Sequence, residues 1–142
     1  KFLCTLFFCL FIALQIQADF LTECDICEYL KNQPSTFQKT ITCLAWESSR
    51  YNTDKTEEWH NWGNWHKTWG LLQLDEAEYC KGSFSWSDGL CDMSCRDFQR
   101  DYKDYGAACI LKAYQYKGFS AFKKYQDGYC QGNSIANYCT SC

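Results

Sequence analysis

Residues 69–80 have the sequence Trp-Gly-Leu-Leu-Gln-Leu-Asp-Glu-Ala-Glu-Tyr-Cys, and this stretch lies between two parts of the chain with different patterns. The leucines within residues 71–74 indicate a short buried segment. Before it, residues 51–70 mix Asn, Thr, Gly and four Trp without helical periodicity, which favours short strands and turns. The segments that precede and follow this central region, residues 24–49 and 96–125, have helical periodicity instead. Helices on both sides of a small β region predict an α+β fold.

Apolar residues recur at helical spacing in these two segments. In the second predicted helix, Phe37, Ile41 and Leu44 form one apolar face. Ser35, with Gln38 three residues later, fits a capping box at the start of that helix. The predicted helices cover residues 24–32, 35–49, 96–113 and 120–125.

Cysteine is the strongest compositional signal, with twelve in 142 residues. Two of them lie in an N-terminal apolar run. The other ten form an even set, which in a small exported chain indicates a disulfide framework. Cys24 and Cys27 are one helical turn apart, and Cys139 and Cys142 have the same spacing. Two such pairs that face each other in antiparallel directions are able to form adjacent bridges, Cys24–Cys142 and Cys27–Cys139.

The N-terminal segment has the pattern of a secretory signal. Lys1 precedes an apolar run that ends at Ile16, and a small residue, Ala18, follows. The run is short for a membrane span, which makes a membrane anchor the weaker alternative. We therefore expect residues 1–18 to be a signal peptide and residues 19–142 to be one secreted domain, with no membrane attachment after cleavage.

Charge and histidine content argue against two classes of function. The formal net charge is −3, and binding to phosphate backbones requires a surface rich in Lys and Arg, so we expect no nucleic-acid partner. His60 and His66 lie in a Trp-rich stretch with no cysteine nearby, unlike the clustered ligands of a zinc site. We expect no metal site and no cofactor.

An ordered set of motifs runs through the chain. The motifs are Cys24-Asp-Ile, Cys43, Tyr51-Asn-Thr, Trp69-Gly-Leu-Leu-Gln-Leu, the cysteines at 80, 91, 95 and 109, Gly118-Phe-Ser-Ala-Phe and Cys130-Gln-Gly. Each motif is weak alone, but the set with its cysteine spacing resembles the C-type lysozyme family, which includes alpha-lactalbumin. The resemblance covers nearly all of residues 19–142. It implies the C-type lysozyme fold, with a helical lobe and a small β lobe.

The resemblance also implies a disulfide pattern. The four bridges of the family map onto Cys24–Cys142, Cys43–Cys130, Cys80–Cys95 and Cys91–Cys109. Cys27 and Cys139 remain, and the helical spacing described above joins them. We therefore expect five bridges.

The resemblance further implies glycoside hydrolysis by two carboxyl groups, a general acid at the end of the second helix and an Asp on the β hairpin. The family's acid lies five residues after the cysteine of that helix, which here is Ser48. Glu47 falls one place early, and one residue turns a helix by about 100°. Glu47 would substitute for the acid only if the helix shifted locally. The Asp position is Thr68, which carries no charge, so we expect hydrolysis to be lost.

For a substrate cleft, the resemblance points to Gln73, Asp75, Glu78, Tyr79 and Trp69. Glu78 and Tyr79 stand where many lysozymes carry sugar-stacking aromatic residues. The four Trp of residues 59–69 form either a sugar-stacking wall or packing within the β lobe.

The calcium ligands of alpha-lactalbumin map onto Arg100, Tyr105 and Gly106. A hard cation needs oxygen ligands, so we expect no calcium site.

Three functions remain open from the sequence. The preferred hypothesis is a secreted lysozyme-like protein that has lost muramidase activity and binds a glycan, such as peptidoglycan, or a protein. The alternative is a divergent active lysozyme that hydrolyses the β-1,4 bonds of bacterial peptidoglycan. A purely structural secreted protein is the third. We expect a monomer in each case.

Overall fold

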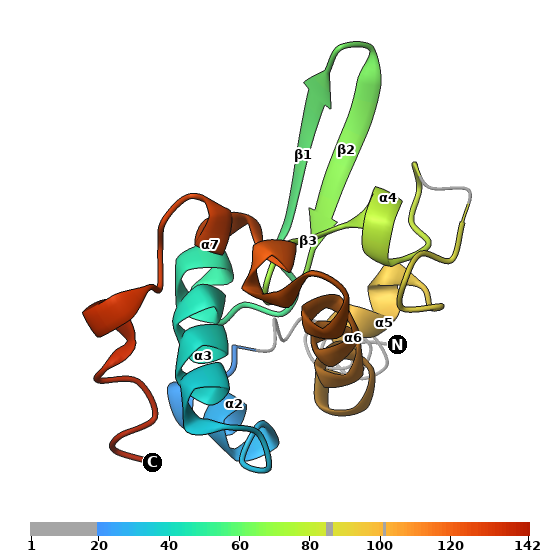
Figure 1. Ribbon diagram of the computed structural model, residues 1–142. Helices are drawn as coiled ribbons and strands as arrows, with labels where there is room; N and C mark the ends of the chain where they lie inside the picture. The colour runs from blue at the N-terminus through green and yellow to red at the C-terminus, as the bar shows by residue number, and fades with distance from the viewer. Residues whose placement is uncertain (1–19, 85–86, 101) are drawn as a thin grey trace, which may run out of the picture.

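The computed structural model describes residues 20–84, 87–100 and 102–142, so the predicted signal peptide lies outside the described residues. Figure 1 shows a helical region and a β hairpin that projects away from it. The elements are α2 (Glu23–Tyr29), α3 (Ser35–Ser49), β1 (Thr56–Asn61), β2 (Asn64–Trp69), β3 (Leu74–Asp75), α4 (Glu76–Tyr79), α5 (Cys95–Arg100), α6 (Ala107–Lys117) and α7 (Lys123–Gln126). The predicted α+β fold, with a helical lobe and a small β lobe, is confirmed.

The capping box lies at the first of these helices and not at the second. The Thr22 hydroxyl accepts from the Asp25 backbone N–H (3.2 Å), and the Asp25 carboxylate accepts from the Thr22 backbone N–H (2.7 Å). At α3, Pro34 is the N-cap, so Ser35 is already inside the helix and makes no cap. The Gln38 amide instead donates to a backbone carbonyl of the preceding turn, at 2.6 Å. The predicted Ser35–Gln38 capping box is therefore wrong.

The three strands form one antiparallel sheet in the order β1-β2-β3. In the hairpin, Trp59 pairs with His66 and His60 pairs with Trp65. Successive side chains along a strand point to opposite faces. Trp59 and His66 therefore share one face of the hairpin, and Trp65 lies on the other.

A two-residue turn closes the hairpin. Trp62 and Gly63 have φ angles of 49° and 85°. Positive φ at both central residues is the mark of a type I′ turn, whose twist matches that of the flanking strands. This geometry suits Gly63, whereas Trp62 holds a conformation that favours Asn or Gly.

The predicted helix over residues 96–113 is interrupted. α5 is followed by a π-helical segment, Tyr102–Gly106, and then by α6, which continues to Lys117. The buried Tyr102 ring packs against Gly106, where an added Cβ would lie 2.7 Å from the ring. Amphipathic spacing alone cannot distinguish this wider turn from a regular one. The prediction of one continuous helix is wrong, although the helical character of the region is correct.

The core lies between α3, the segment after β2, and α6, with fully buried side chains such as Ile41, Leu44, Leu72 and Phe122. Five disulfides surround it: Cys24–Cys142, Cys27–Cys139, Cys43–Cys130, Cys80–Cys95 and Cys91–Cys109. These five pairs coincide with the pairs expected from the sequence. They tie the C-terminal segment to α2 and α3, and they tie the α4 region to α5 and α6.

Candidate functional site

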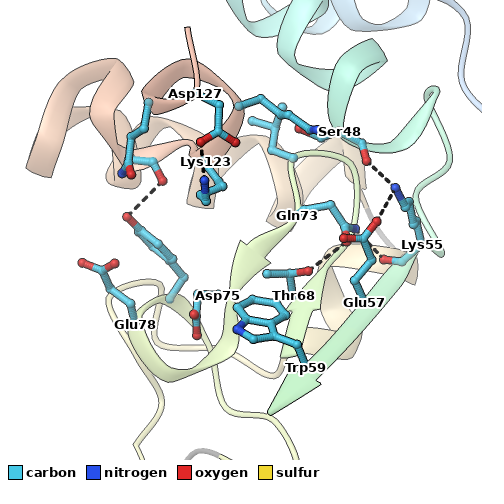
Figure 2. Close-up of a pocket in the computed structure, with 15 residues that line it drawn as sticks. Ser48, Lys55, Glu57, Trp59, Thr68, Gln73, Asp75, Glu78, Lys123 and Asp127 are labelled. Atoms are coloured by element: carbon cyan, nitrogen blue, oxygen red, sulfur yellow. Dashed lines mark hydrogen bonds and ion pairs between the residues drawn. The ribbon is translucent and has the colours of Figure 1, made fainter. Parts of the chain in front are cut away.

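A cleft of about 470 Å³ lies between the β lobe and the helices α3 and α7. Figure 2 shows side chains from both sides pointing into it. The β1 and β2 strands supply one wall, the β3–α4 segment supplies the floor, and residues 121–127 supply the opposite wall. A volume of this size is typical of sites for small organic ligands.

Four of the five expected cleft residues line this cavity: Gln73, Asp75, Glu78 and Tyr79. Gln73 is held in place by three hydrogen bonds. Its Oε1 accepts from the Thr68 hydroxyl (2.9 Å), and its Nε2 donates to the backbone oxygens of Lys55 (2.9 Å) and Gly70 (2.7 Å). Thr68 and Gln73 therefore form a fixed polar surface where the β2 wall meets the floor of the cleft.

Trp69, the fifth expected cleft residue, does not line the cavity. It follows Thr68 on β2, so its side chain points to the opposite face of the sheet. There its indole N–H donates to the buried Glu76 carboxylate at 2.8 Å. Trp69 is a buried residue that anchors β2 to α4.

The end of α3 presents Ser48 to the cleft and turns Glu47 away from it. Ser48 lines the cleft and is only 4% exposed. Glu47 is not among the residues that line the cleft, and its carboxylate lies 3.5 Å from Arg50 Nη1. A rotation of about 100° between neighbouring helical residues accounts for this difference. The local helix shift that would bring Glu47 into the cleft is not present.

Lys55 and Glu57 line the cleft close to these positions, and the sequence motifs do not identify them. The Lys55 ammonium donates to the Ser48 backbone oxygen (2.7 Å) and pairs with the Glu57 carboxylate (2.6 Å). Glu57 is the cross-strand partner of Thr68. Two residues paired in this way project from the same face, with Cβ atoms about 5 Å apart. The hairpin register is the signal that would have identified Glu57.

The remaining walls of the cleft also contain paired charges. Glu78 binds Lys117, and Lys123 binds Asp127. The hydrogen bond that the Lys117 ammonium donates to the Glu78 carboxylate raises the pKa of that ammonium. The Tyr79 ring is buried, and burial raises the pKa of its hydroxyl, which donates to the Ala121 oxygen at 3.4 Å.

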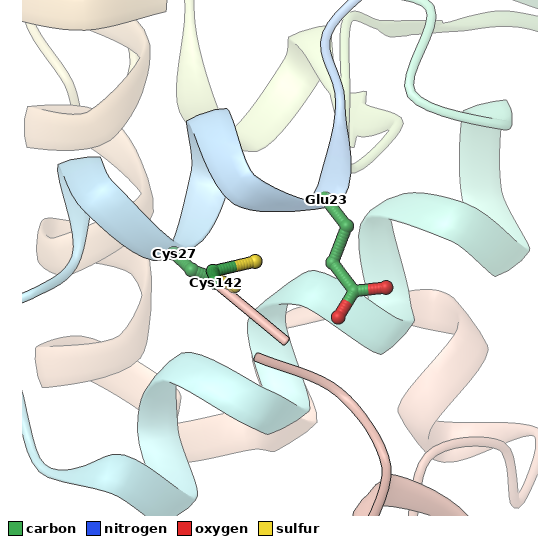
Figure 3. A group of neighbouring side chains, drawn as sticks. All are labelled: Glu23, Cys27 and Cys142. Atoms are coloured by element: carbon green, nitrogen blue, oxygen red, sulfur yellow. The ribbon is translucent and has the colours of Figure 1, made fainter. Parts of the chain in front are cut away.

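A second cluster brings carboxylate and sulfur atoms together at α2 (Figure 3). Glu23, Cys27 and Cys142 have ligand-type atoms within 4.8 Å of one another. Both sulfurs belong to disulfides, so neither is a thiolate able to bind a metal. Glu23 accepts a hydrogen bond from the Cys139 backbone N–H at 2.7 Å, which holds the C-terminal segment against α2. The expectation of no calcium or zinc site stays a prediction.

Comparison with known proteins agrees with this architecture. The model of the C-type lysozyme/alpha-lactalbumin family matches residues 19–142. The chain is 25% identical to alpha-lactalbumin of Rattus norvegicus over 114 residues, which cover 78% of this chain and 69% of the relative. It is 27% identical to the milk isozyme of lysozyme C of Canis lupus familiaris over 101 residues, which cover 70% and 76%. The chain belongs to the C-type lysozyme/alpha-lactalbumin family.

Proposed function

We propose that this protein is a secreted, non-hydrolytic member of the family that binds glycans in the cleft between its lobes. One observation carries the proposal. At the cleft, the end of α3 offers Ser48 and β2 offers Thr68, the two positions where the family's mechanism uses carboxyl groups. A serine or threonine hydroxyl does not protonate a leaving group as a carboxylic acid does, and it carries no negative charge to stabilise an oxocarbenium ion.

Lys55 adds a second obstacle to hydrolysis. Its ammonium donates to the Ser48 backbone oxygen, so a cation lies at the end of α3 where the family has its acid. The ammonium is also bound to the Glu57 carboxylate, as Figure 2 shows. A cation in this place disfavours the positive charge that develops on the sugar during glycoside cleavage.

The rest of the cleft supports saccharide binding. Trp59 offers an aromatic surface, and Asp75 and Gln126 offer hydrogen-bonding groups. Gln73 offers only the lone pair of Oε1 that its internal hydrogen bonds leave open. Sugars present both an apolar ring face and many hydroxyls, so they need this combination of an aromatic surface and polar groups. The same cleft does not need carboxylates in catalytic positions to retain affinity.

A divergent hydrolase is the second candidate, and Glu57 is the observation that favours it. Its side chain projects from the cleft face of β1 opposite Thr68, so a carboxylate lies near the family's Asp position although it comes from the neighbouring strand. This candidate still requires a proton donor at the end of α3, and the Ser48 position does not supply one.

The disulfides support the proposed secretion. The structure has five disulfides, which form and persist in oxidising compartments, and small exported domains are rich in them. Within the part of the chain that the structure describes, no helix is both long and apolar enough to cross a membrane.

Co-sedimentation of the purified protein with insoluble peptidoglycan and with chitin tests the proposal, when release of reducing ends is measured in the same samples. We expect the protein to sediment with at least one of the two polymers while no reducing ends appear above background. Release of reducing ends that disappears in Glu57→Gln would favour the second candidate. A protein that stays in solution with both polymers and cleaves neither would contradict both.

A further inference from the structure

The cleft has its exposed aromatic surface on the β hairpin. Trp59 lines the cleft and keeps 41% of its surface exposed. Its ring stacks on His66, its cross-strand partner, with centroids 5.3 Å apart and an angle of 9° between the rings. Because a parallel ring covers one face of the indole, the orientation of Trp59 is fixed while the rest of its surface remains open.

Positions 78 and 79 do not provide such a surface. Glu78 has no ring, and its carboxylate is bound to Lys117. Tyr79 has a ring, but it is only 2% exposed and packs in the core. Among the described residues that line this cleft, the aromatic face available to a ligand is therefore the one on β1.

The charges around the cleft indicate the class of ligand. Three lysines line the cleft: Lys55 is bound to Glu57, Lys123 is bound to Asp127, and Lys124 lies over the ring of Tyr129. An anionic ligand would have to compete with a carboxylate at Lys55 or Lys123. It would also meet more negative than positive side chains, because the three lysines of the lining are outnumbered by four carboxylates, those of Glu57, Asp75, Glu78 and Asp127. An uncharged ligand leaves both pairs intact.

We infer that Trp59, held in place by His66, is the stacking platform for a ring of an uncharged oligosaccharide at the hairpin end of the cleft. This inference rests on the proposed glycan binding. It adds the place in the cleft where the glycan binds and the expectation that the glycan is uncharged. Stacking on a flat indole depends on an apolar ring face, and polar groups of the floor then fix the sugar's orientation. His66 is a positioning residue, because it contacts the indole and is not among the residues that line the cleft.

Calorimetric titration with two probes tests the inference. The uncharged probe is tetra-N-acetylchitotetraose, and the anionic probe is a hyaluronan tetrasaccharide. We expect the uncharged probe to bind at least about tenfold more tightly than the anionic one. Trp59→Ala should weaken binding of the uncharged probe about tenfold, whereas Trp59→Phe should retain most of the affinity because it keeps an aromatic face.

Trp65→Ala is the matched control, because Trp65 neighbours His66 on β2, is 56% exposed and points to the opposite face. It should bind like the wild type. His66→Ala should weaken binding about threefold, and His66→Phe should restore it by stacking on the same indole. Thermal melting of each variant establishes that it is folded.

The outcomes separate the inference from the proposed function. Binding of the uncharged probe that is unchanged in folded Trp59→Ala would overturn the inference and leave glycan binding intact. Equal losses in Trp59→Ala and Trp65→Ala would place the contact outside the cleft and would also overturn it. Equal affinity for the anionic probe would refute the ligand class. Wild-type protein that binds neither probe, with no sedimentation on the polymers, would contradict the inference and the proposed function together.

Discussion

Lys55 changes the chemistry of the cleft although it lies outside every motif of the sequence. It sits one residue before β1, and its ammonium reaches the last turn of α3 through the Ser48 backbone oxygen. Any acid introduced at position 48 would therefore lie beside a cation. An opposite charge lowers the pKa of a carboxyl group, and a general acid must remain protonated to act.

The double variant Ser48→Glu/Thr68→Asp tests this view of the site. We expect it to gain measurable hydrolysis of cell-wall suspensions, while each single variant gains less, because the acid and the second carboxylate act as a unit. Adding Lys55→Gln should raise that activity about tenfold, since the new acid then stays protonated at higher pH. Activity that does not respond to Lys55→Gln at any pH would mean that the cation does not control the acid.

The buried hydroxyl of Tyr102 lowers the stability of the folded state. This hydroxyl has no hydrogen-bond partner among the described residues. Burial raises the pKa of this hydroxyl, so the folded state holds the proton more tightly than the unfolded state does. The stability that the folded state gains from this raised pKa is fully present below the unfolded pKa of about 10, and it is lost as the pH rises above that value.

Tyr102→Phe should therefore leave stability at pH 7 unchanged or raise it by about 1 kcal/mol, because it removes an unsatisfied buried group. The gain over wild type should grow between pH 9 and 11. Urea unfolding at both ends of that range measures it. Tyr29→Phe is a suitable control, because Tyr29 packs edge-on against Tyr102 and is only partly buried. A clear loss of stability at pH 7 in Tyr102→Phe would show that the hydroxyl is satisfied after all.

Glu47 and Glu57 illustrate which side-chain directions can be predicted from the sequence and which cannot. The outward direction of Glu47 follows from the helical period and the position of Cys43, and both are visible in the sequence. The inward direction of Glu57 depends on which residue of β2 it faces. Register is set by turn geometry and by the hairpin as a whole, so counting residues along one strand does not supply it.

At the scale of elements, local periodicity predicts the regular helix correctly, whereas contacts between side chains decide where the other helix is interrupted. The helix predicted over residues 35–49 has the bounds of α3, because its apolar face is continuous and Pro34 marks its start. The helix predicted over residues 96–113 contains a π-helical segment, because the Tyr102 ring packs on Gly106. Packing between side chains decides such details, and periodicity does not record it.

The hairpin turn contains a residue that its geometry does not favour. Trp62 has a φ of 49° and is 95% exposed, so burial does not compensate for its conformation. Trp62→Asn should stabilise the protein by about 1 kcal/mol, because Asn-Gly is the preferred type I′ sequence. Trp62→Val should destabilise it, since a β-branched residue resists positive φ. Chemical unfolding measures both, and a stabilising Trp62→Val would contradict the turn assignment.

At the scale of the whole molecule, the disulfides differ in how much each constrains the chain. Cys27–Cys139 joins residues 112 apart in sequence, but Cys24–Cys142 already closes a loop around it. The inner bridge therefore closes only the few residues between the two bridges. Cys80–Cys95 closes a separate loop with a sequence separation of 15, which is worth about 3 kcal/mol in the chain-entropy model.

Replacing both members of the inner bridge with Ala should cost less stability than the same change at Cys80 and Cys95. Peptide mapping without reduction establishes that the other bridges remain, and calorimetry gives the difference in Tm. The opposite order would mean that the packing of Cys27 against α3 contributes more than the loop does.

At the scale of the whole molecule, the fold of the C-type lysozyme/alpha-lactalbumin family carries a cleft lined by Ser48 and Thr68, and the proposed loss of hydrolysis is the central claim. The most direct test is the turbidity of a bacterial cell-wall suspension with purified wild-type protein between pH 4 and 8. Loss of one positioned acid alone lowers rates by about 10² to 10⁴. We predict no clearing above a buffer control at any pH in this range. Clearing by the wild type that disappears in Glu57→Gln or Glu47→Gln would contradict the account.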